Sequence, residues 1–438
     1  MAIPPVPTLP PQVAEAVDFL WAFLSTWWWV PLPFLLASLL KDFYLWWRYN
    51  VYWGKIDWVL LELRTPRDVE RPMKAMEQVI ANFWTLYDPP DFKEIWFEGK
   101  FLVPFELEIA GIDGNVHFFI RTPSSMRKVF ESAVYSQYPD VEIVEVEDYT
   151  KQVPQDLPNE NWDMWGCDFK LVKPECYPLK TYVDFFEPTT SEKEEKRIDP
   201  LAVLIEGMTR LKKGEQLWFQ IRLKPVQDKD SHWIARGKKE IEKITGRKPK
   251  EAPNKSITGE AIWAFMEGRP PSFEVTKEEE KAWPVEMRLT PGERDILSAI
   301  ENKIGKLGFE SNVRMIYLGE NEAFFKPNLR LILNFSVGMS TSNLNNIMPT
   351  RTTKVVAPAL FRKRKLYMKK KRMFRRYIRR QTPLYPWSGE PGKTTFALNT
   401  EEVATMFHFP SKAGAPTPTF ERIEAKKAGP PLALPVEE

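Results

Sequence analysis

The feature that most constrains this chain is an uncharged run of 22 residues, 19–40, between Asp18 and Lys41. An α-helix rises about 1.5 Å per residue, so a helix of this length could cross a hydrocarbon core of about 30 Å. The run therefore predicts a transmembrane helix that attaches the chain to a lipid bilayer. The residues assigned to the membrane are Phe19, Leu20, Trp21, Phe23, Leu24, Leu32, Phe34, Leu35, Leu36, Leu39 and Leu40.

Two features of this run leave another interpretation open. Pro31 and Pro33 interrupt it, and the tryptophans at 27–29 would lie unusually deep in a bilayer. A buried hydrophobic hairpin or an interfacial segment would also fit, although membrane helices tolerate proline. A cleaved signal peptide fits badly, because no Lys or Arg precedes the run and the apolar stretch is long for such a peptide.

Basic residues on one side of the run predict its orientation. Lys41, Arg48 and Lys55 follow the run, and no basic residue precedes it. The positive-inside rule then predicts a single-pass protein of the cell (inner or cytoplasmic) membrane with its body in the cytoplasm. The dense aromatic residues of 43–58 suit the headgroup layer, so we expect the body to lie close to the bilayer.

Residues 56–150 have the hydrophobic periodicity of a β-α-β-β-α-β unit, which is a ferredoxin-like order. Glu106 and Glu108 alternate with apolar residues on the predicted hairpin, which favours one solvent-exposed face. The expected elements are a strand at 58–61, a helix at 73–87, a hairpin at 105–120, a helix at 124–134 and a strand at 141–146.

The remainder of the body predicts a second α+β domain at 151–350. It begins with a polar connection, 149–178, and carries an insertion at about 247–285 whose prolines and charge runs predict disorder. Thr290-Pro291-Gly292-Glu293 predicts a helix start. The expected fold class is α+β, with an N-terminal transmembrane helix, two ferredoxin-like α/β sandwich units and a basic helix. The remaining parts are a membrane anchor at 1–55, a basic arm at 351–397 and a C-terminal linker or docking tail at 398–438.

Catalytic chemistry has little support in the sequence. Two cysteines and three histidines form no cluster with metal-ligand spacing. Residues 388–395 end like a phosphate-binding loop, but Trp387 stands where the first glycine belongs and Pro391 removes a backbone N–H donor. A surface turn is the simpler interpretation. We therefore expect no catalytic residue, cofactor or metal, and no enzyme activity.

Charge is distributed unevenly along the chain. The total of 62 Lys and Arg against 59 Asp and Glu is nearly balanced, yet residues 361–380 hold 12 basic residues and no acid. This segment predicts an amphipathic cationic helix for DNA phosphates or anionic lipid headgroups. A solvated helix facing an acidic protein is the alternative. The predicted contact residues are Arg362, Lys363, Arg364, Lys365, Lys369, Lys370, Lys371, Arg372, Arg375, Arg376, Arg379 and Arg380.

Several segments resemble the N-terminal, membrane-anchored region of type IV secretion and conjugation ATPases of the HerA/FtsK superfamily, the TraC- and TraG-like proteins. These segments are Tyr135–Ile143, Gly214–Trp218, Ser342–Asn345, Leu398–Pro410 and Arg422–Lys427. In that family a segment like Leu398–Pro410 precedes the motor domain. No Walker A, Walker B or arginine-finger motif is present in this sequence, so the resemblance does not extend to ATPase activity.

The resemblance implies a non-catalytic, membrane-tethered component of a type IV secretion or conjugation-like translocation machine. Its expected partners are the bilayer, a separately encoded ATPase subunit and DNA, and self-association is left open. The alternative is a stand-alone, membrane-proximal scaffold that binds nucleic acid or anionic lipid. An enzyme with an unrecognised site is a third interpretation.

Overall fold

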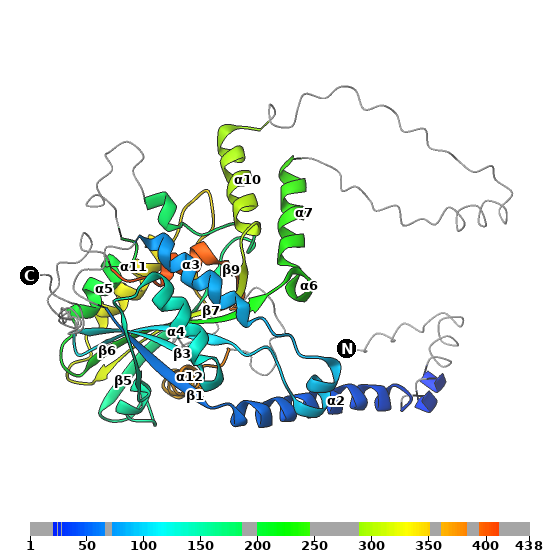
Figure 1. Ribbon diagram of the computed structural model, residues 1–438. Helices are drawn as coiled ribbons and strands as arrows, with labels where there is room; N and C mark the ends of the chain where they lie inside the picture. The colour runs from blue at the N-terminus through cyan, green and yellow to red at the C-terminus, as the bar shows by residue number, and fades with distance from the viewer. Residues whose placement is uncertain are drawn as a thin grey trace, which may run out of the picture. The chain divides into compact units, whose positions relative to one another are not determined.

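The computed structural model (Figure 1) divides the chain into two compact units. One lies within Met1–Asp57 and Asp88–Leu102, and the other within Trp58–Tyr87 and Val103–Glu438. The residues that the structure describes are 21–23, 25–27, 29–65, 72–185, 199–245, 289–350, 361–382 and 394–410.

The first unit is built on the long helix α2, Pro31–Lys55, and the short π-helix η2, Glu94–Glu98. The Tyr44 hydroxyl donates a hydrogen bond to the Trp96 carbonyl at 2.8 Å, and the rings of Tyr49 and Phe101 stack with centroids 3.9 Å apart. Gly99 ends η2 with a φ of 74°, and a Cβ there would lie 2.4 Å from a backbone oxygen of α2. Only glycine permits this close contact.

Within the part of the chain that is described, none of the helices is both long enough and apolar enough to cross a membrane. The predictions of a transmembrane helix and of a single-pass protein of the cell membrane are therefore wrong. Helical residues at 21–23 and 25–27 are followed by a turn at Trp29 and a bend at Val30, and α2 begins at Pro31. Proline suits a first helical position, so it divides the uncharged run between two helices. Of the residues assigned to the membrane, Phe19, Leu20 and Leu24 lie outside the described residues.

The second unit contains one nine-stranded sheet, and all its strand pairs are antiparallel. The order is β4-β1-β3-β2-β6-β7-β5-β8, with β9 also paired to β7. The strands are β1 Trp58–Arg64, β2 Phe105–Ile112, β3 Asn115–Pro123, β4 Glu142–Val146, β5 Trp162–Leu171, β6 Glu215–Val226, β7 Gly308–Glu320, β8 Ile347–Pro349 and β9 Phe396–Asn399.

The prediction of two separate ferredoxin-like units is wrong, because β2 and β6 join the two halves of the chain. β2 pairs with β6 from Phe105↔Leu223 to Ile112↔Gln216. β2 would have been an edge strand of a first, independent sheet. It is instead hydrogen-bonded along its length to β6, a strand from the second half of the chain. A strand left unpaired at that position would expose a row of N–H and C=O groups, which pairing removes.

Helices cover both faces of this sheet. The main hydrophobic core lies on one face, where α3, α4, α5, α11 and α13 contribute buried residues. On the other face, α12 packs over a second cluster that includes Trp218, Ile316 and Leu318. Side chains alternate between faces along each strand, so both coverings are needed to bury the sheet. The helices are α3 Met73–Phe83, α4 Arg127–Gln137, α5 Ala202–Thr209, α11 Leu329–Gly338, α12 Arg362–Ile378 and α13 Thr400–Met406.

Figure 1 shows α7, Trp233–Thr245, and α10, Pro291–Ile304, side by side next to the sheet. The short α6, Asp228–Ser231, precedes α7. Thr290 begins α10 with a capping box to Glu293, which confirms the helix start predicted from the sequence. The insertion expected at about 247–285 lies outside the described residues.

The segment expected to be a docking tail begins inside the fold. Leu398 belongs to β9, which pairs with β7 from Gly308↔Asn399 to Ser311↔Phe396. The following helix α13 is almost entirely buried, and its Glu402 accepts hydrogen bonds from the backbone N–H groups of Asn399 and Leu179 at 2.9 and 2.8 Å. Residues 411–438 lie outside the described residues.

Candidate functional site

The basic helix predicted from the sequence is α12, and one side of it is fixed to the sheet. Met373, Phe374 and Tyr377 are at most 1 % exposed. The ring of Tyr377 lies over that of Trp218, with centroids 5.2 Å apart. These apolar residues recur at helical spacing, so their packing on the sheet fixes which side of α12 faces outward.

Most of the charge of α12 is exposed. Seven basic residues are exposed, and none of the seven forms an ion pair with another residue in the described ranges. Arg364, Arg372, Arg375 and Arg379 share one side of the helix and extend over about 22 Å at 1.5 Å per residue. The exposed basic residues are Arg362, Lys363, Arg364, Lys365, Arg372, Arg375 and Arg379.

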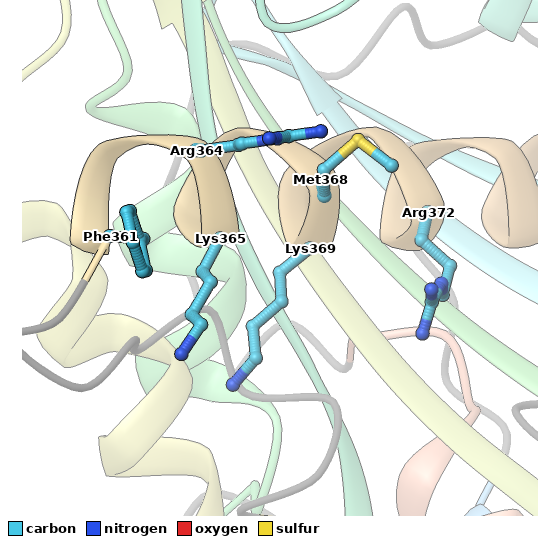
Figure 2. Close-up of a pocket in the computed structure, with 6 residues that line it drawn as sticks. All are labelled: Phe361, Arg364, Lys365, Met368, Lys369 and Arg372. Atoms are coloured by element: carbon cyan, nitrogen blue, oxygen red, sulfur yellow. The ribbon is translucent and has the colours of Figure 1, made fainter.

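Figure 2 shows a shallow hollow of about 440 Å³ along the N-terminal part of α12. The side chains of Lys365, Lys369 and Arg372 point to the same side of the helix. Two apolar residues, Phe361 and Met368, also line the hollow and are 70 % and 53 % exposed. The hollow therefore combines positive charge with a small apolar surface.

Arg380 is placed differently from the other predicted contact residues, because it is buried. Its Nε and Nη2 lie 3.1 and 3.2 Å from the two carboxylate oxygens of Glu108, and Nη2 also lies 3.1 Å from Asp148. Burial disfavours the charged guanidinium, but the two carboxylates outweigh this and raise the pKa of Arg380 well above its usual value. Arg380 therefore holds α12 on the sheet and cannot contact a ligand.

Four further predicted contact residues are partly buried: Lys369, Lys370, Lys371 and Arg376. Lys370 forms an ion pair with Asp163. Burial lowers the pKa of Arg376 to about 10. These side chains are less exposed than the other seven, so they contribute less to an outer surface.

A buried polar network connects α12 to the strands below it. The Tyr149 hydroxyl donates to Glu108 at 2.8 Å and lies 2.9 Å from the Tyr377 hydroxyl, and the Gln220 side chain donates to Glu108 at 2.7 Å. Burial raises the pKa of both tyrosines well above the usual value, so both stay protonated. Because Glu108 is saturated with donors, this network is suited to holding a helix in place and not to abstracting a proton.

A second anchor lies beside the first. Nε of Arg314 donates to Asp168 at 2.8 Å, and its Nη2 donates to the Gln381 carbonyl at 2.6 Å, just beyond α12. No local pattern in the sequence predicts this pair or the role of Glu108, because the partners are 146 and 272 residues apart. The exposed glutamate face expected for the hairpin is wrong, since Glu106 and Glu108 are both 0 % exposed.

Other reactive groups do not gather into a site. In the residues with assigned positions, no group of three His, Cys, Asp or Glu could hold a metal ion. Cys167 and Cys176 are buried and are not joined in a disulfide, and burial raises the pKa of the Cys176 thiol to about 11. His408 is buried between Asp199, 3.0 Å away, and the Ala404 carbonyl. The phosphate-loop lookalike lies outside the described residues except for Thr394 and Thr395.

A family model described as a domain of unknown function, DUF8128, matches residues 102–419. The chain belongs to this family. A search of curated proteins finds no match. The DUF8128 match contains β2 to β9, α12 and the network around Glu108, whereas α2 precedes it. The basic helix is therefore part of the DUF8128 domain.

Proposed function

We propose that the chain is a non-catalytic, nucleic-acid-binding component that contacts the phosphate backbone of DNA through the outward side of α12. The observation that carries this proposal is a group of exposed basic residues on a helix whose opposite side packs on the sheet. Five of them share the outward side at 100° per residue: Arg364, Lys365, Arg372, Arg375 and Arg379. Phosphates attract such side chains without a specific sequence, and each neutralised phosphate releases counterions. A helix held in place by buried contacts presents its charges at little entropic cost.

DNA suits α12 better than lipid, because the apolar side of this helix already packs on the sheet. A helix that binds a bilayer surface inserts its apolar face among the acyl chains. In α12 that face, with Met373, Phe374 and Tyr377, is already buried against the sheet. The exposed surface of α12 holds Phe361, Tyr367 and Met368 beside seven basic residues, so positive charge dominates it and suits phosphates in water.

From the resemblance to type IV secretion and conjugation ATPases we further infer that this DNA contact serves a translocation machine. A separate polypeptide would supply the ATPase. The gene next to this one offers the simplest check: a motor protein encoded there supports the inference, and unrelated neighbours favour a stand-alone nucleic-acid-binding scaffold.

The test is the affinity of the full chain for a fluorescent 30-base-pair duplex, measured by anisotropy between 50 and 200 mM salt. Four phosphate contacts predict a slope of about −3.6 in log affinity against log salt, which is a loss of about 150-fold over this range. The variant to compare with the parent carries Gln at four positions: Arg364, Arg372, Arg375 and Arg379. We expect it to lose most of the affinity and most of the salt dependence.

The matched control removes the same charge from exposed basic residues elsewhere in the same unit. These positions are Lys213, Lys238, Lys326 and Arg330. An equal loss of affinity in this control would mean that only net charge matters, and the proposed site would be rejected. Anionic vesicles form the second arm. If the chain binds these vesicles through α12 and does not bind the duplex, the partner of α12 is lipid and not DNA.

A further inference from the structure

Helix α2 presents a broad apolar surface that stays largely exposed within the described part of its unit. Leu36, Leu40, Phe43 and Trp47 recur at steps of four, three and four residues and are 47–67 % exposed. Leu39, Tyr44 and Trp46 flank them and are 62 %, 36 % and 36 % exposed. At about 100° per residue, these side chains cover an arc of about 160° around the helix.

The arc continues beyond α2 through stacked rings. Tyr44 packs on Trp96 with centroids 6.3 Å apart, and Trp96 packs on Phe92 at 5.7 Å. Phe92 and Phe97 are 71 % and 68 % exposed. A surface of this size is unusual on a protein without a partner for it.

A second copy of α2 is a poor occupant for this surface. A two-stranded coiled coil needs apolar positions over at least about three heptads, with charged residues on either side of a narrow seam. The apolar repeat from Leu36 to Trp47 covers fewer than two heptads. The flanking positions are Leu39, Tyr44 and Trp46 instead of charged residues. Both the length of the apolar repeat and the flanking residues fall short of what a stable pair of helices requires.

A bilayer interface fits the same features. Tryptophan and tyrosine prefer the layer between acyl chains and headgroups, and a broad apolar arc suits a helix lying in that plane. Lys41, Arg48 and Lys55 carry positive charge along α2, against Asp42 as its single acid. The charge of the helix is therefore complementary to anionic headgroups.

We propose that α2 lies in the plane of an anionic lipid surface, with the Leu36–Trp47 side inserted among the headgroups and without crossing the bilayer. The site is distinct from α12, so DNA and lipid would be bound by different helices. The occupant is the lipid surface itself and requires no other protein.

The test is flotation of the full chain with vesicles of phosphatidylcholine containing about 30 % phosphatidylglycerol. The stripe variant is Leu40→Asp with Phe43→Asp, and the control is Ala37→Asp with Ser38→Asp, which makes the same charge change away from the stripe. Loss of two buried apolar side chains predicts at least a tenfold drop in vesicle partitioning for the stripe variant. The control carries the same added negative charge but loses little apolar area, so we expect a clearly smaller drop than in the stripe variant.

Several results would overturn the proposal. The first is a parent chain that does not float, and the second is an equal loss in both variants. The third is a lipid-free dimer, seen by light scattering, that the stripe variant converts to a monomer, because that would assign the surface to a second copy. The four-Gln variant of α12 should float like the parent; if it does not, α12 and not α2 binds the lipid. Washing with alkaline carbonate should release the chain, and retention would contradict binding in the plane.

Discussion

Arg379 and Arg380 are neighbours in sequence, but the structure assigns them opposite roles. Replacing Arg380 by Gln removes the guanidinium that pairs with Glu108 and Asp148. Glu108 is 0 % exposed, so its carboxylate would remain buried without a counter-charge. Breaking a buried ion pair in this way costs about 3–5 kcal/mol. For a domain of this size we expect a melting temperature about 6–10 °C lower.

The assay combines thermal unfolding, followed by circular dichroism at pH 7, with duplex binding at 20 °C. Arg380→Gln should unfold earlier and bind DNA within about twofold of the parent. Arg379→Gln should melt like the parent and lower the salt slope by about 0.9. Adding Glu108→Gln to Arg380→Gln removes the orphaned charge and should recover part of the lost stability. If Arg380→Gln kept its melting temperature and lost DNA binding, Arg380 would be a contact residue and our account of the network would fail.

Two further predictions concern charged groups that pair inside the fold. Lys303 and Glu402 form an ion pair at 3.0 Å with both side chains 0 % exposed. Lys303→Met should therefore lower the free energy of unfolding by about 3–5 kcal/mol, because Glu402 would remain buried without a counter-charge. An unchanged midpoint of urea unfolding would contradict this. Burial raises the pKa of Asp148 and Asp199, but Arg380 and His408 respectively outweigh it, so both pKa values are lowered in the folded state. The stability that these two carboxylates contribute is present above the unfolded pKa of about 3.9 and is lost as the pH falls through their pKa values in the folded state. The melting temperature should therefore fall as the pH is lowered from 5 to 3, and a rise over this range would refute the prediction.

Local patterns in the sequence located many of the elements. The apolar spacing from Met73 gave a helix that the structure ends at Phe83, and the turn predicted between β2 and β3 is made by Asp113 and Gly114 with φ of 52° and 87°. The basic helix also lies where its charge and its stripe predicted it. These features depend on residues within a few positions of one another, which is the range over which periodicity carries information.

The features that the sequence missed depend on distant partners. Glu106 and Glu108 alternate with apolar residues as on a half-exposed strand, but α12 covers that face and Arg380 neutralises Glu108 from 272 positions away. β5 lies within 149–178, for which the sequence predicts a polar, proline-containing connection. In the structure, Asp168 is instead the buried partner of Arg314.

The transmembrane prediction failed for a local reason that the length of the uncharged run does not reveal. Pro31 begins a helix, so the apolar residues on either side of it do not share one helix. α2 then continues through Lys41, Asp42 and Arg48, which lowers its mean hydropathy. The aromatic residues that suggested a membrane boundary lie along the side of this helix.

The late position of β9 and α13 in the chain has a consequence for synthesis on the ribosome. β7 can complete its hydrogen bonds at Gly308–Ser311 only when Phe396–Asn399 has emerged, and α13 fills the core with Val403 and Met406. Until then the nascent chain has an open strand edge and an unfilled apolar cavity, which are the features that chaperones bind and that promote aggregation. Folding of the sheet is therefore expected to finish only after nearly all of its residues have been translated.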